Sequence, residues 1–406
     1  MSGIVIIGAG HAGVNVAASL RKLDAEVAIT LLSAEDQIPY HRPPLSKKAV
    51  FDESLPIEML QANGYYEKAN IDLRLKTPVA SIDTTAKSVT LADGNQLPYE
   101  QLVIATGTKL RDLPAPGGEL AQGVYTYADI QSLGPRLQAA NKLVVVGGGF
   151  IGCEVAAGAL KMGKQVSLLI TGPRALRKAV APILGETVTQ LHRDSGMDVR
   201  TGCRVQEITP QGVSTDQGFV EADLVITGIG ADANMQLAQD AGLQTQNGIL
   251  VNQFGHTSAA HIYAVGDVAE FPYGSGEHKA SLRLESIQNA TDQGALVAAN
   301  IIAERQQQAY KAYAPTPWFW SDQGDLKLQM AGLGSLDAEH KVLPGNTDTT
   351  LTVVHLQDNI MIAVDTLNVP GNHLAARKLL EMKKPISWAM IEEYEFDLKK
   401  LFKALR

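Results

Sequence analysis

The apolar positions of this chain fall into short runs that stop at glycine. In the first, four β-branched residues at positions 4–7 precede Gly8-Ala9-Gly10-His11-Ala12-Gly13, and a helical pattern follows over 14–23. With this spacing the first glycine permits a tight strand-to-helix turn, the second lets the backbone approach a pyrophosphate, and the third allows close helix packing. The unpaired N–H groups at the start of the helix favour an anion there. The stretch therefore predicts a nucleotide-binding turn.

The same pattern returns in the middle of the chain. An apolar run at 142–146 leads into Gly147-Gly148-Gly149-Phe150-Ile151-Gly152, followed by a helical pattern and a strand-like run at 165–169. Each copy also has a downstream strand that ends in small residues, which let a backbone pass close to a ligand. These endings are Ala105-Thr106-Gly107 and Thr227-Gly228-Ile229-Gly230. The repetition predicts a duplicated dinucleotide-binding architecture.

Two dinucleotide sites in one chain indicate electron transfer between a flavin and a nicotinamide. In the first copy a strand-like run at 26–32 ends near Glu35, about where an acid that holds a ribose is expected. A third strand, from Ile262, stops at Gly266-Asp267-Val268. By itself that turn is equally typical of an ordinary strand ending with a solvent-facing aspartate.

Composition and charge narrow the class of protein. A chain of 406 residues with 45% hydrophobic side chains can form two or three domains. The net charge of −8 argues against a nucleic-acid-binding surface. No apolar run reaches the roughly 18 residues that a membrane span needs, and the chain begins with a strand pattern in place of a signal peptide. We therefore expect no membrane association and a cytoplasmic location.

The two cysteines, Cys153 and Cys203, are fifty positions apart. They form neither a Cys-x-x-Cys pair nor a zinc quartet, so we expect no metal and no protein dithiol beside the cofactor. Both are expected to be buried small residues, with Cys203 alternatively a loop thiol.

Two other regions have a local signature. Pro43 and Pro44 exclude a regular helix or central strand, which predicts a rigid loop presenting Arg42 and Lys47, or simply a proline-rich surface connection. Ala92-Asp93-Gly94 predicts a hairpin turn. Near the C-terminus we expect strands around 326–330, 351–356 and 360–364, a hairpin turn at 357–359, and then helices.

Together the motifs resemble the FAD-dependent ferredoxin reductases that serve cytochrome P450 and ring-hydroxylating dioxygenase systems. The resemblance covers essentially the whole chain, although single motifs also occur in disulfide reductases and apoptosis-inducing factor. It rests on the two glycine turns, Ala105-Thr106-Gly107, Gly266-Asp267, and three further stretches: Arg42-Pro43-Pro44-Leu45-Ser46-Lys47, Arg283-x-Glu285-Ser286 and Pro317-Trp318-Phe319-Trp320-Ser321-Asp322-Gln323.

The resemblance implies an α/β fold with two Rossmann-like, glutathione-reductase-like domains, the second inserted in the first, and an α+β C-terminal domain. The FAD domain would comprise 1–114 and 245–315, the NAD(P) domain 115–244, and the C-terminal interface domain 316–406. The repeat agrees with this, because the Gly266-Asp267 turn must return to the first fingerprint after the second is complete.

The resemblance also implies the site residues. Val79 would touch adenine through its backbone, and Trp320 would lie over the isoalloxazine. The positions expected to bind FAD are Gly8, Gly10, His11, Ala12, Gly13, Glu35, Arg42, Lys47, Val79, Ala105, Thr106, Gly107, Arg111, Gly266, Asp267, Val268, Glu285, Ser286 and Trp320. Those expected on the nicotinamide side are Gly147, Gly149, Phe150, Ile151, Gly152, Glu154, Thr171, Arg174, Gly228 and Gly230.

Lys47, Glu154 and Trp320 are the expected catalytic residues. In the resembled family a pair at the positions of Lys47 and Glu154 sits beside the flavin ring where the nicotinamide arrives. A cation near the ring would stabilise the reduced, anionic flavin. Alternatively, Glu154 simply caps or packs within the helix that follows the second glycine turn.

The choice between NADH and NADPH stays open. NADH-preferring relatives place a glutamate where this chain has Ile170, which leaves no carboxylate for the 2′-hydroxyl. Downstream, Thr171, Arg174 and the cations at 177 and 178 could receive a 2′-phosphate, although an arginine at position 174 is also common in NADH relatives. In the FAD half, relatives have an acid where this chain has Ala34, and here the acid comes one position later, at Glu35.

The partner implied by the resemblance is a [2Fe–2S] ferredoxin. Lys and Arg gather late in the chain, either as a solvated face or as a docking surface for an acidic ferredoxin. The alternatives are a rubredoxin reductase or NADH oxidase of the same fold, or a flavoprotein that mainly binds NADH, as apoptosis-inducing factor does.

Overall fold

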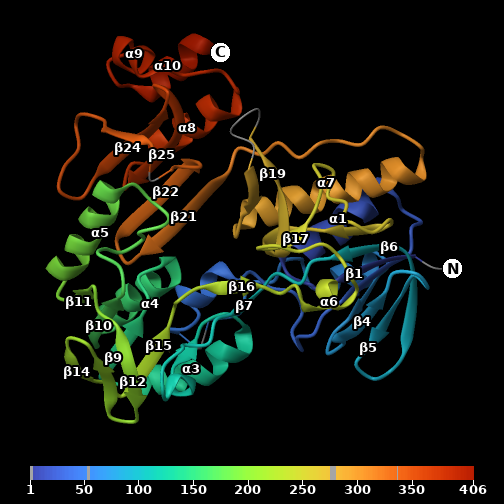
Figure 1. Cartoon of the computed structure of the whole chain (residues 1–406), viewed down its shortest axis with the longest axis horizontal. Coiled ribbons are helices and arrows are strands. Elements are labelled where there is room, and N and C mark those ends of the chain that lie inside the picture. The colour runs from blue at the N-terminus through green and yellow to red at the C-terminus, as the bar shows by residue number, and fades with distance from the viewer. Residues whose placement is uncertain (1–2, 53–54, 275–279, 336) are drawn as a thin grey trace. The chain divides into compact units, whose positions relative to one another are not determined.

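The computed structural model describes residues 3–52, 55–274, 280–335 and 337–406 (Figure 1). The chain forms two compact units. The first comprises Met1–His41, Ile57–Lys109 and Ala231–Pro315, and the second comprises Arg42–Pro56, Leu110–Gly230 and Thr316–Arg406. Both units are assembled from segments that are distant in the sequence, so the chain leaves the first unit and returns to it.

The first unit is built on a parallel sheet with the strand order β3-β2-β1-β6-β18. The glycine turn follows β1, so it lies at the carboxyl end of the central strand, where doubly wound sheets bind nucleotides. The strands are β1 (Gly3–Ile7), β2 (Ile29–Leu32), β3 (Ile71–Arg74), β6 (Gln96–Ile104) and β18 (Ile262–Ala264).

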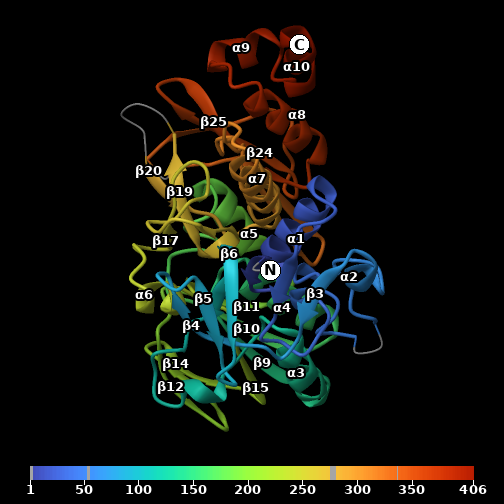
Figure 2. The same cartoon turned by 90° about the vertical axis from the view of Figure 1, so that its right-hand side faces the viewer.

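Alternation along β1 gives this sheet two buried faces. Ile4 and Ile6 pack in one core with α1 (His11–Leu23) and α7 (Ile287–Arg305), while Val5 and Ile7 pack in a second core on the other face. In both views α1 and α7 lie side by side against the sheet (Figures 1 and 2). A strand buried on both faces explains why the run before the glycine turn is continuously apolar.

Smaller elements complete the first unit. β4 (Val79–Asp83), β5 (Ser88–Leu91) and β6 form an antiparallel meander, and the turn predicted at 92–94 joins its last two strands. The remaining elements are α2 (Tyr65–Lys68), β7 (Thr108–Leu110, which crosses the unit boundary), β16 (Ala231–Ala233), α6 (Gln236–Asp240), β17 (Ile249–Leu250), η3 (Gly266–Val268), β19 (Ala269–Tyr273) and β20 (Ala280–Arg283).

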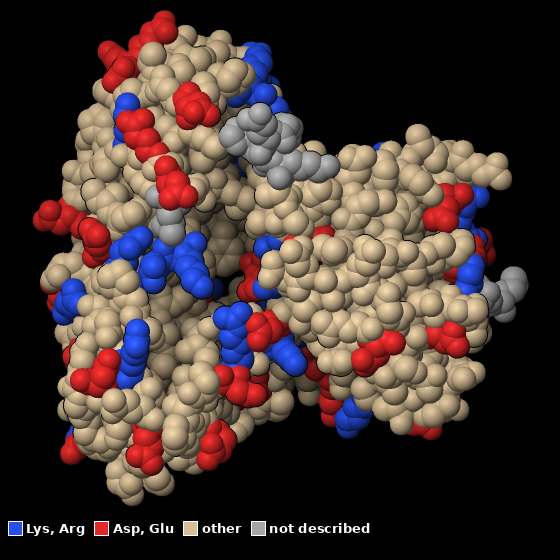
Figure 3. All heavy atoms as spheres, viewed as in Figure 1, with Lys and Arg blue, Asp and Glu red and all other residues tan. Residues whose placement is uncertain are grey.

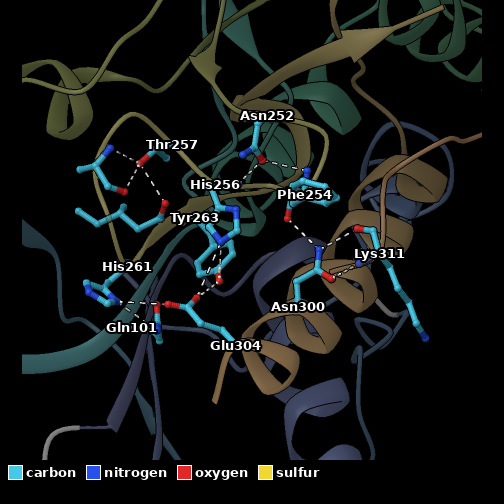
Figure 4. Close-up of polar contacts among 12 residues, drawn as sticks. Gln101, Asn252, Phe254, His256, Thr257, His261, Tyr263, Asn300, Glu304 and Lys311 are labelled. Carbon is cyan, nitrogen blue, oxygen red and sulfur yellow. Dashed lines mark hydrogen bonds and ion pairs between the residues drawn. The ribbon is translucent and has the colours of Figure 1, made fainter. Parts of the chain in front are cut away.

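A polar network holds the C-terminal end of α7 against this unit (Figure 4). The Tyr263 hydroxyl donates to Glu304 over 2.6 Å, and His256 Nε2 lies 2.9 Å from the same hydroxyl. His261 Nδ1 lies 3.5 Å from the other carboxylate oxygen of Glu304. Burial lowers the pKa of His256 despite the nearby carboxylate, so its imidazole is neutral at pH 7.

The second unit repeats the design of the first. Its parallel sheet has the order β11-β10-β9-β15-β8, with β9 central and followed by the second glycine turn. An antiparallel meander, β12-β13-β14, again accompanies it. The elements are η1 (Pro43–Ser46), η2 (Gly118–Leu120), β8 (Gln122–Gly123), α3 (Tyr127–Ala139), β9 (Lys142–Val146), α4 (Phe150–Lys161), β10 (Gln165–Ile170), α5 (Pro182–Asp194), β11 (Asp198–Thr201), β12 (Val205–Thr209), β13 (Gly212–Thr215), β14 (Gly218–Glu221) and β15 (Leu224–Thr227).

The C-terminal part of the second unit is an antiparallel sheet, β21-β22-β25-β24-β23, followed by three helices. The predicted turn joins β24 to β25, and Asp358 and Asn359 there have φ of 51° and 62°, as a tight two-residue hairpin requires. The elements are β21 (Trp318–Gln323), β22 (Leu326–Gly332), β23 (Glu339–Val342), β24 (Leu351–Gln357), β25 (Ile360–Leu367), α8 (Pro370–Glu381), α9 (Trp388–Glu393) and α10 (Leu398–Leu405).

Two local features differ from the sequence expectations. Pro43–Ser46 forms a short 3-10 helix, because proline is tolerated in a first helical turn. Cys203 was expected to be either a buried small residue or a loop thiol, and it is both, since it lies between β11 and β12 and is 1% exposed. The pattern did not predict β21, whose aromatic residues lack a simple apolar alternation. Across the described parts of the chain, every helix is too short or too polar to cross a bilayer.

Candidate functional site

The three glycines of the first turn have different structural roles. Gly8 has φ of +105°, and a Cβ on Gly13 would stand 1.9 Å from the Gly8 carbonyl oxygen, so the fold itself demands both. A Cβ on Gly10 would have no described atom within 4 Å. Gly10 is therefore not needed for packing within the protein, and its open position suits a bound pyrophosphate that approaches the backbone.

The second turn repeats this division. Gly147 has φ of +116°, and a Cβ on Gly152 would lie 2.0 Å from the Gly147 oxygen. For Gly149 the nearest described atom to a Cβ is the Gly228 oxygen at 3.7 Å, an ordinary contact. Two equivalent cradles, each able to receive a phosphate group, thus lie at the ends of the two central strands.

The small-residue strand endings lie against these turns, as predicted. A Cβ on Gly8 would stand 2.3 Å from the Ala105 oxygen, and one on Gly147 would stand 2.4 Å from the Gly228 oxygen. Larger side chains would force these backbones apart. Thr106, beside the first turn, donates its hydroxyl to the Asn234 oxygen over 2.8 Å.

The third strand returns to the first turn. Gly266 has φ of +74°, a Cβ there would stand 2.7 Å from the Cβ of Ala12, and its N–H donates to Gln293 Oε1 on α7 over 2.7 Å. Val268 is fully buried, whereas Asp267 is only partly buried. Gly266 is therefore required by its close approach to Ala12, which leaves no room for a side chain. The role of Asp267 stays a prediction.

Several other candidates in the first unit have partners within the protein. His11, the first residue of α1, packs edge-on against the His41 ring at 5.3 Å. Glu35 follows β2 and accepts a 2.5 Å hydrogen bond from the Tyr40 hydroxyl. Val79 begins β4.

The stretch before α7 also has structural roles. Arg283 pairs with Glu285 over 2.7 Å and donates to the Asp267 carbonyl oxygen over 3.0 Å. Ser286 caps α7 by accepting the Asn289 N–H.

In the second unit, Lys47 and Glu154 form the ion pair that the sequence suggested. Lys47 Nζ lies 3.0 Å from Glu154 Oε1, and Glu154 is 5% exposed. Ser46 donates its hydroxyl to Oε2 over 2.5 Å, and Ser321 donates to Oε1 over 2.7 Å. Glu154 is thus engaged by three side chains from outside α4, which excludes the alternative that it only caps or packs in its helix. Ser46 and Ser321 both lie in motifs that carry the family resemblance, but no local feature of the sequence predicts that they hydrogen-bond to Glu154.

Strand β21 explains this convergence through its alternation. Phe319 packs on Phe150 with ring centroids 4.6 Å apart, Ser321 meets Glu154, and Gln323 Oε1 lies 2.9 Å from His192 Nε2. Three successive residues on one face of β21 therefore contact α4 and α5. Trp318 and Trp320 alternate with them and stack on each other at 5.5 Å.

Arg42, Arg111 and Cys153 also lie in the second unit. Arg42 donates to the Tyr125 carbonyl oxygen over 2.8 Å and lies over that ring, and the Arg111 N–H donates to the Gly230 oxygen over 3.1 Å. Burial, with a smaller contribution from the Glu154 charge, raises the pKa of Cys153 to about 12. This thiol is therefore not a nucleophile at neutral pH.

The segment after β10 carries the candidates for the adenosine end of the nucleotide. Ile170, where a glutamate is expected in NADH-preferring relatives, is 4% exposed and packs against Gly148. Thr171 and the cations at 177 and 178 are exposed, while Arg174 is half-buried against α5. Over the described residues, no group of three His, Cys, Asp or Glu side chains is arranged to hold a metal ion.

Comparison with known proteins identifies families and relatives that share this architecture. Residues 2–294 match the family described as pyridine nucleotide-disulphide oxidoreductase, and residues 318–402 match the one described as reductase C-terminal. Rhodocoxin reductase of Rhodococcus erythropolis is 36% identical over 98% of this chain and 93% of its own length. Rubredoxin-NAD(+) reductase of Pseudomonas putida is 36% identical over 90% of this chain and 96% of its own.

Among solved structures, the ferredoxin reductase for the CYP199A2 system from Rhodopseudomonas palustris superimposes with a TM-score of 0.90 at 34% identity, covering 98% of both chains. Similarity at this level extends over both glycine turns and the C-terminal sheet. The chain therefore belongs to the pyridine nucleotide-disulphide oxidoreductase family, and within it to the ferredoxin reductases, as its sequence motifs predict.

Proposed function

We propose that the protein is an FAD-dependent reductase that passes electrons from NADH or NADPH to a [2Fe–2S] ferredoxin, which serves a cytochrome P450 or a ring-hydroxylating dioxygenase. The observation that carries this proposal is the pair of equivalent turns whose Gly10 and Gly149 positions are open while their neighbours are tightly packed. Two phosphate cradles in one chain suit two dinucleotides. We place the enzyme in the cytoplasm, where both reductants are available.

The first unit contributes the residues that would hold FAD. Backbone N–H groups of the turn at 8–13 would hold the pyrophosphate, Glu35 would hold a ribose, and Asp267 would supply a carboxylate for hydroxyl groups. In this proposal residues 1–114 and 245–315 form the FAD domain. The further flavin contacts that the resemblance implies are Arg42, Lys47, Arg111 and Trp320.

The second turn would hold the nicotinamide nucleotide, in a domain formed by 115–244. Its glycines and the start of α4 at Phe150 and Ile151 would bind the pyrophosphate, with Gly228 and Gly230 lining the approach. Because Ile170 offers no carboxylate and cations follow it, NADPH as well as NADH is a candidate donor. Stopped-flow reduction with each nucleotide decides between them, and a strong preference for NADH would refute a 2′-phosphate site.

The buried ion pair has a chemical role in this proposal. When bound, FAD would accept a hydride from the nicotinamide and pass the electrons on, one at a time, to the ferredoxin. Lys47 would stabilise the negative charge of the reduced flavin, and Glu154, held by Ser46 and Ser321, would fix the position of the ammonium group. The hydride step needs no protein acid or base, so its efficiency depends on placing the two rings.

The C-terminal part, residues 316–406, is the proposed interface for the ferredoxin. Lys and Arg side chains line the upper right edge of this part in Figure 3. Lys378, Lys384, Lys399 and Lys403 are among the exposed cations. An acidic ferredoxin would associate faster with such a surface. We expect ferredoxin reduction to slow steeply as salt is added, and a flat salt response would refute the docking surface.

The central experiment combines the absorption spectrum of the purified protein with a panel of acceptors. Rapid cytochrome c reduction by NAD(P)H only after a [2Fe–2S] ferredoxin is added supports the proposal. The 36% identity to a rubredoxin reductase makes rubredoxin the second acceptor to test. Faster turnover with rubredoxin, rapid reduction of oxygen alone, or a long-lived charge-transfer complex with slow turnover would refute it.

A further inference from the structure

The segment between β10 and α5, residues 171–181, is hydrogen-bonded directly to the second glycine turn. The Leu176 N–H donates to the Gly148 carbonyl oxygen over 2.8 Å. One residue earlier, the Ala175 N–H donates to Thr189 Oγ1 on α5 over 2.9 Å. The conformation of this segment is therefore coupled to the turn that is proposed to bind the nucleotide phosphates.

The middle of the segment is conformationally strained. Leu176 has φ of +54° and is 2% exposed, although a residue with a branched side chain rarely adopts this left-handed conformation. Such a residue persists only where its surroundings hold it in place. The 171–181 segment thus depends on contacts at its ends to keep this shape.

Asp365 supplies the contact at the C-terminal end of the segment. This residue of β25 is 3% exposed, and its Oδ2 accepts the Ala181 N–H over 2.8 Å. His355 Nε2 on β24 lies 2.7 Å from the same oxygen and fixes the carboxylate. A buried charge-assisted hydrogen bond is both directional and strong. The C-terminal sheet therefore anchors a segment that is 184 positions away in the sequence.

The candidate phosphate-binding cation of the segment is Arg174. Its side chain is half-buried beside Gly185 of α5. Its Nε is buried and has no hydrogen-bond partner among the described residues. The segment whose C-terminal end is anchored by Asp365 therefore also carries this cation.

We propose that Asp365 is a positioning residue for nucleotide binding. By accepting the Ala181 N–H, it holds the 171–181 segment in the strained conformation that is bonded to Gly148 and presents its cations to the adenosine end of NAD(P)H. The C-terminal domain would then help to set nucleotide affinity as well as carry the ferredoxin interface. This inference rests on the proposed function, since it assumes that the second turn binds the nicotinamide nucleotide.

The test is anaerobic stopped-flow reduction of the flavin-loaded full chain by NADH and by NADPH, without ferredoxin. Asp365→Ala removes the acceptor, and Asp365→Val removes it while largely filling its space in the strand. Asp365→Asn keeps an acceptor oxygen and is the rescue variant. His192→Ala is the matched control, since it removes a different buried hydrogen bond, from α5 to Gln323 of the C-terminal sheet.

We expect Asp365→Ala and Asp365→Val to raise the apparent nucleotide Kd about tenfold, the order expected for one charge-assisted hydrogen bond, with the limiting reduction rate changed less than about twofold. Asp365→Asn and His192→Ala should stay close to the parent. If Asp365→Ala fails to retain flavin, Asp365→Val, which leaves no large cavity, decides.

An unchanged Kd in a flavin-retaining variant, or an equal rise in His192→Ala, would overturn the inference. Absence of flavin reduction in the parent chain would instead refute the proposed function.

Discussion

The ion pair between Lys47 and Glu154 offers the sharpest test of how the second unit is held together. At 3.0 Å and an effective dielectric constant of about 20, the gross attraction is about 5 kcal/mol. Lys47 is 20% exposed, so solvent screens part of this, and the Ser46 and Ser321 hydroxyls stabilise the carboxylate even without the lysine. We therefore expect a coupling energy of about 2–3 kcal/mol.

A double-mutant cycle with Lys47→Met and Glu154→Gln measures this coupling. Lys47→Met leaves the buried Glu154 carboxylate without its counter-charge and should destabilise the unit by about 3 kcal/mol. Glu154→Gln leaves the half-buried Lys47 unpaired and should cost somewhat less, and the double variant should cost much less than the sum. Urea unfolding followed by tryptophan fluorescence suits the measurement, because all three tryptophans, at 318, 320 and 388, lie in the second unit.

The matched control is the ion pair between Lys161 and Asp325, which also has one partner on α4 but joins it to the turn between β21 and β22. Its atoms are 2.6 Å apart, but the side chains are 53% and 92% exposed, so its coupling should be no more than about 0.5 kcal/mol. A coupling below that value for Lys47 and Glu154, or equal couplings for the two pairs, would refute the reasoning that burial makes the inner pair strong.

Three further predictions concern other parts of the molecule. Gly13→Ala should destabilise the first unit and lower its urea unfolding midpoint. Gly10→Ala should fold normally but bind FAD more weakly, as measured by equilibrium dialysis. Equal effects of the two substitutions would contradict the different roles of the two glycines. Burial and the nearby Arg377 lower the pKa of His373 to about 4, below the unfolded value of 6.5, so its contribution to stability is complete above pH 6.5 and is lost as the pH drops towards 4. His373→Phe should flatten this part of the stability profile, and an unchanged acid slope would show that His373 is not responsible. Glu304→Met should cost about 1 kcal/mol in thermal unfolding. Combining it with Tyr263→Phe should cost less than the sum of the two single losses, because both substitutions remove the Tyr263–Glu304 hydrogen bond; additive losses would contradict this.

The Lys47–Glu154 pair shows which contacts sequence motifs can predict and which they cannot. Resemblance suggested the pair, but it did not supply Ser46 and Ser321, which complete the carboxylate's hydrogen bonding. Ser321 is 167 positions from Glu154 and reaches it only because one face of β21 packs on α4. Asp365 had no sequence signal at all, since it is a single charged residue in a short, mostly apolar strand and belongs to no motif.

The sequence by itself determined the two glycine turns, the strands that precede them and the family to which the chain belongs. These features depend on backbone geometry and side-chain size within a few consecutive residues, so a short stretch of sequence contains the whole constraint. Tertiary structure alone decided that Gly8 and Gly13 serve the fold while Gly10 stays open, that Ile170 packs on Gly148, and that Asp365 anchors the segment before α5. Such contacts join residues far apart in the chain, and their energies depend on how the elements pack against one another, which no local pattern records.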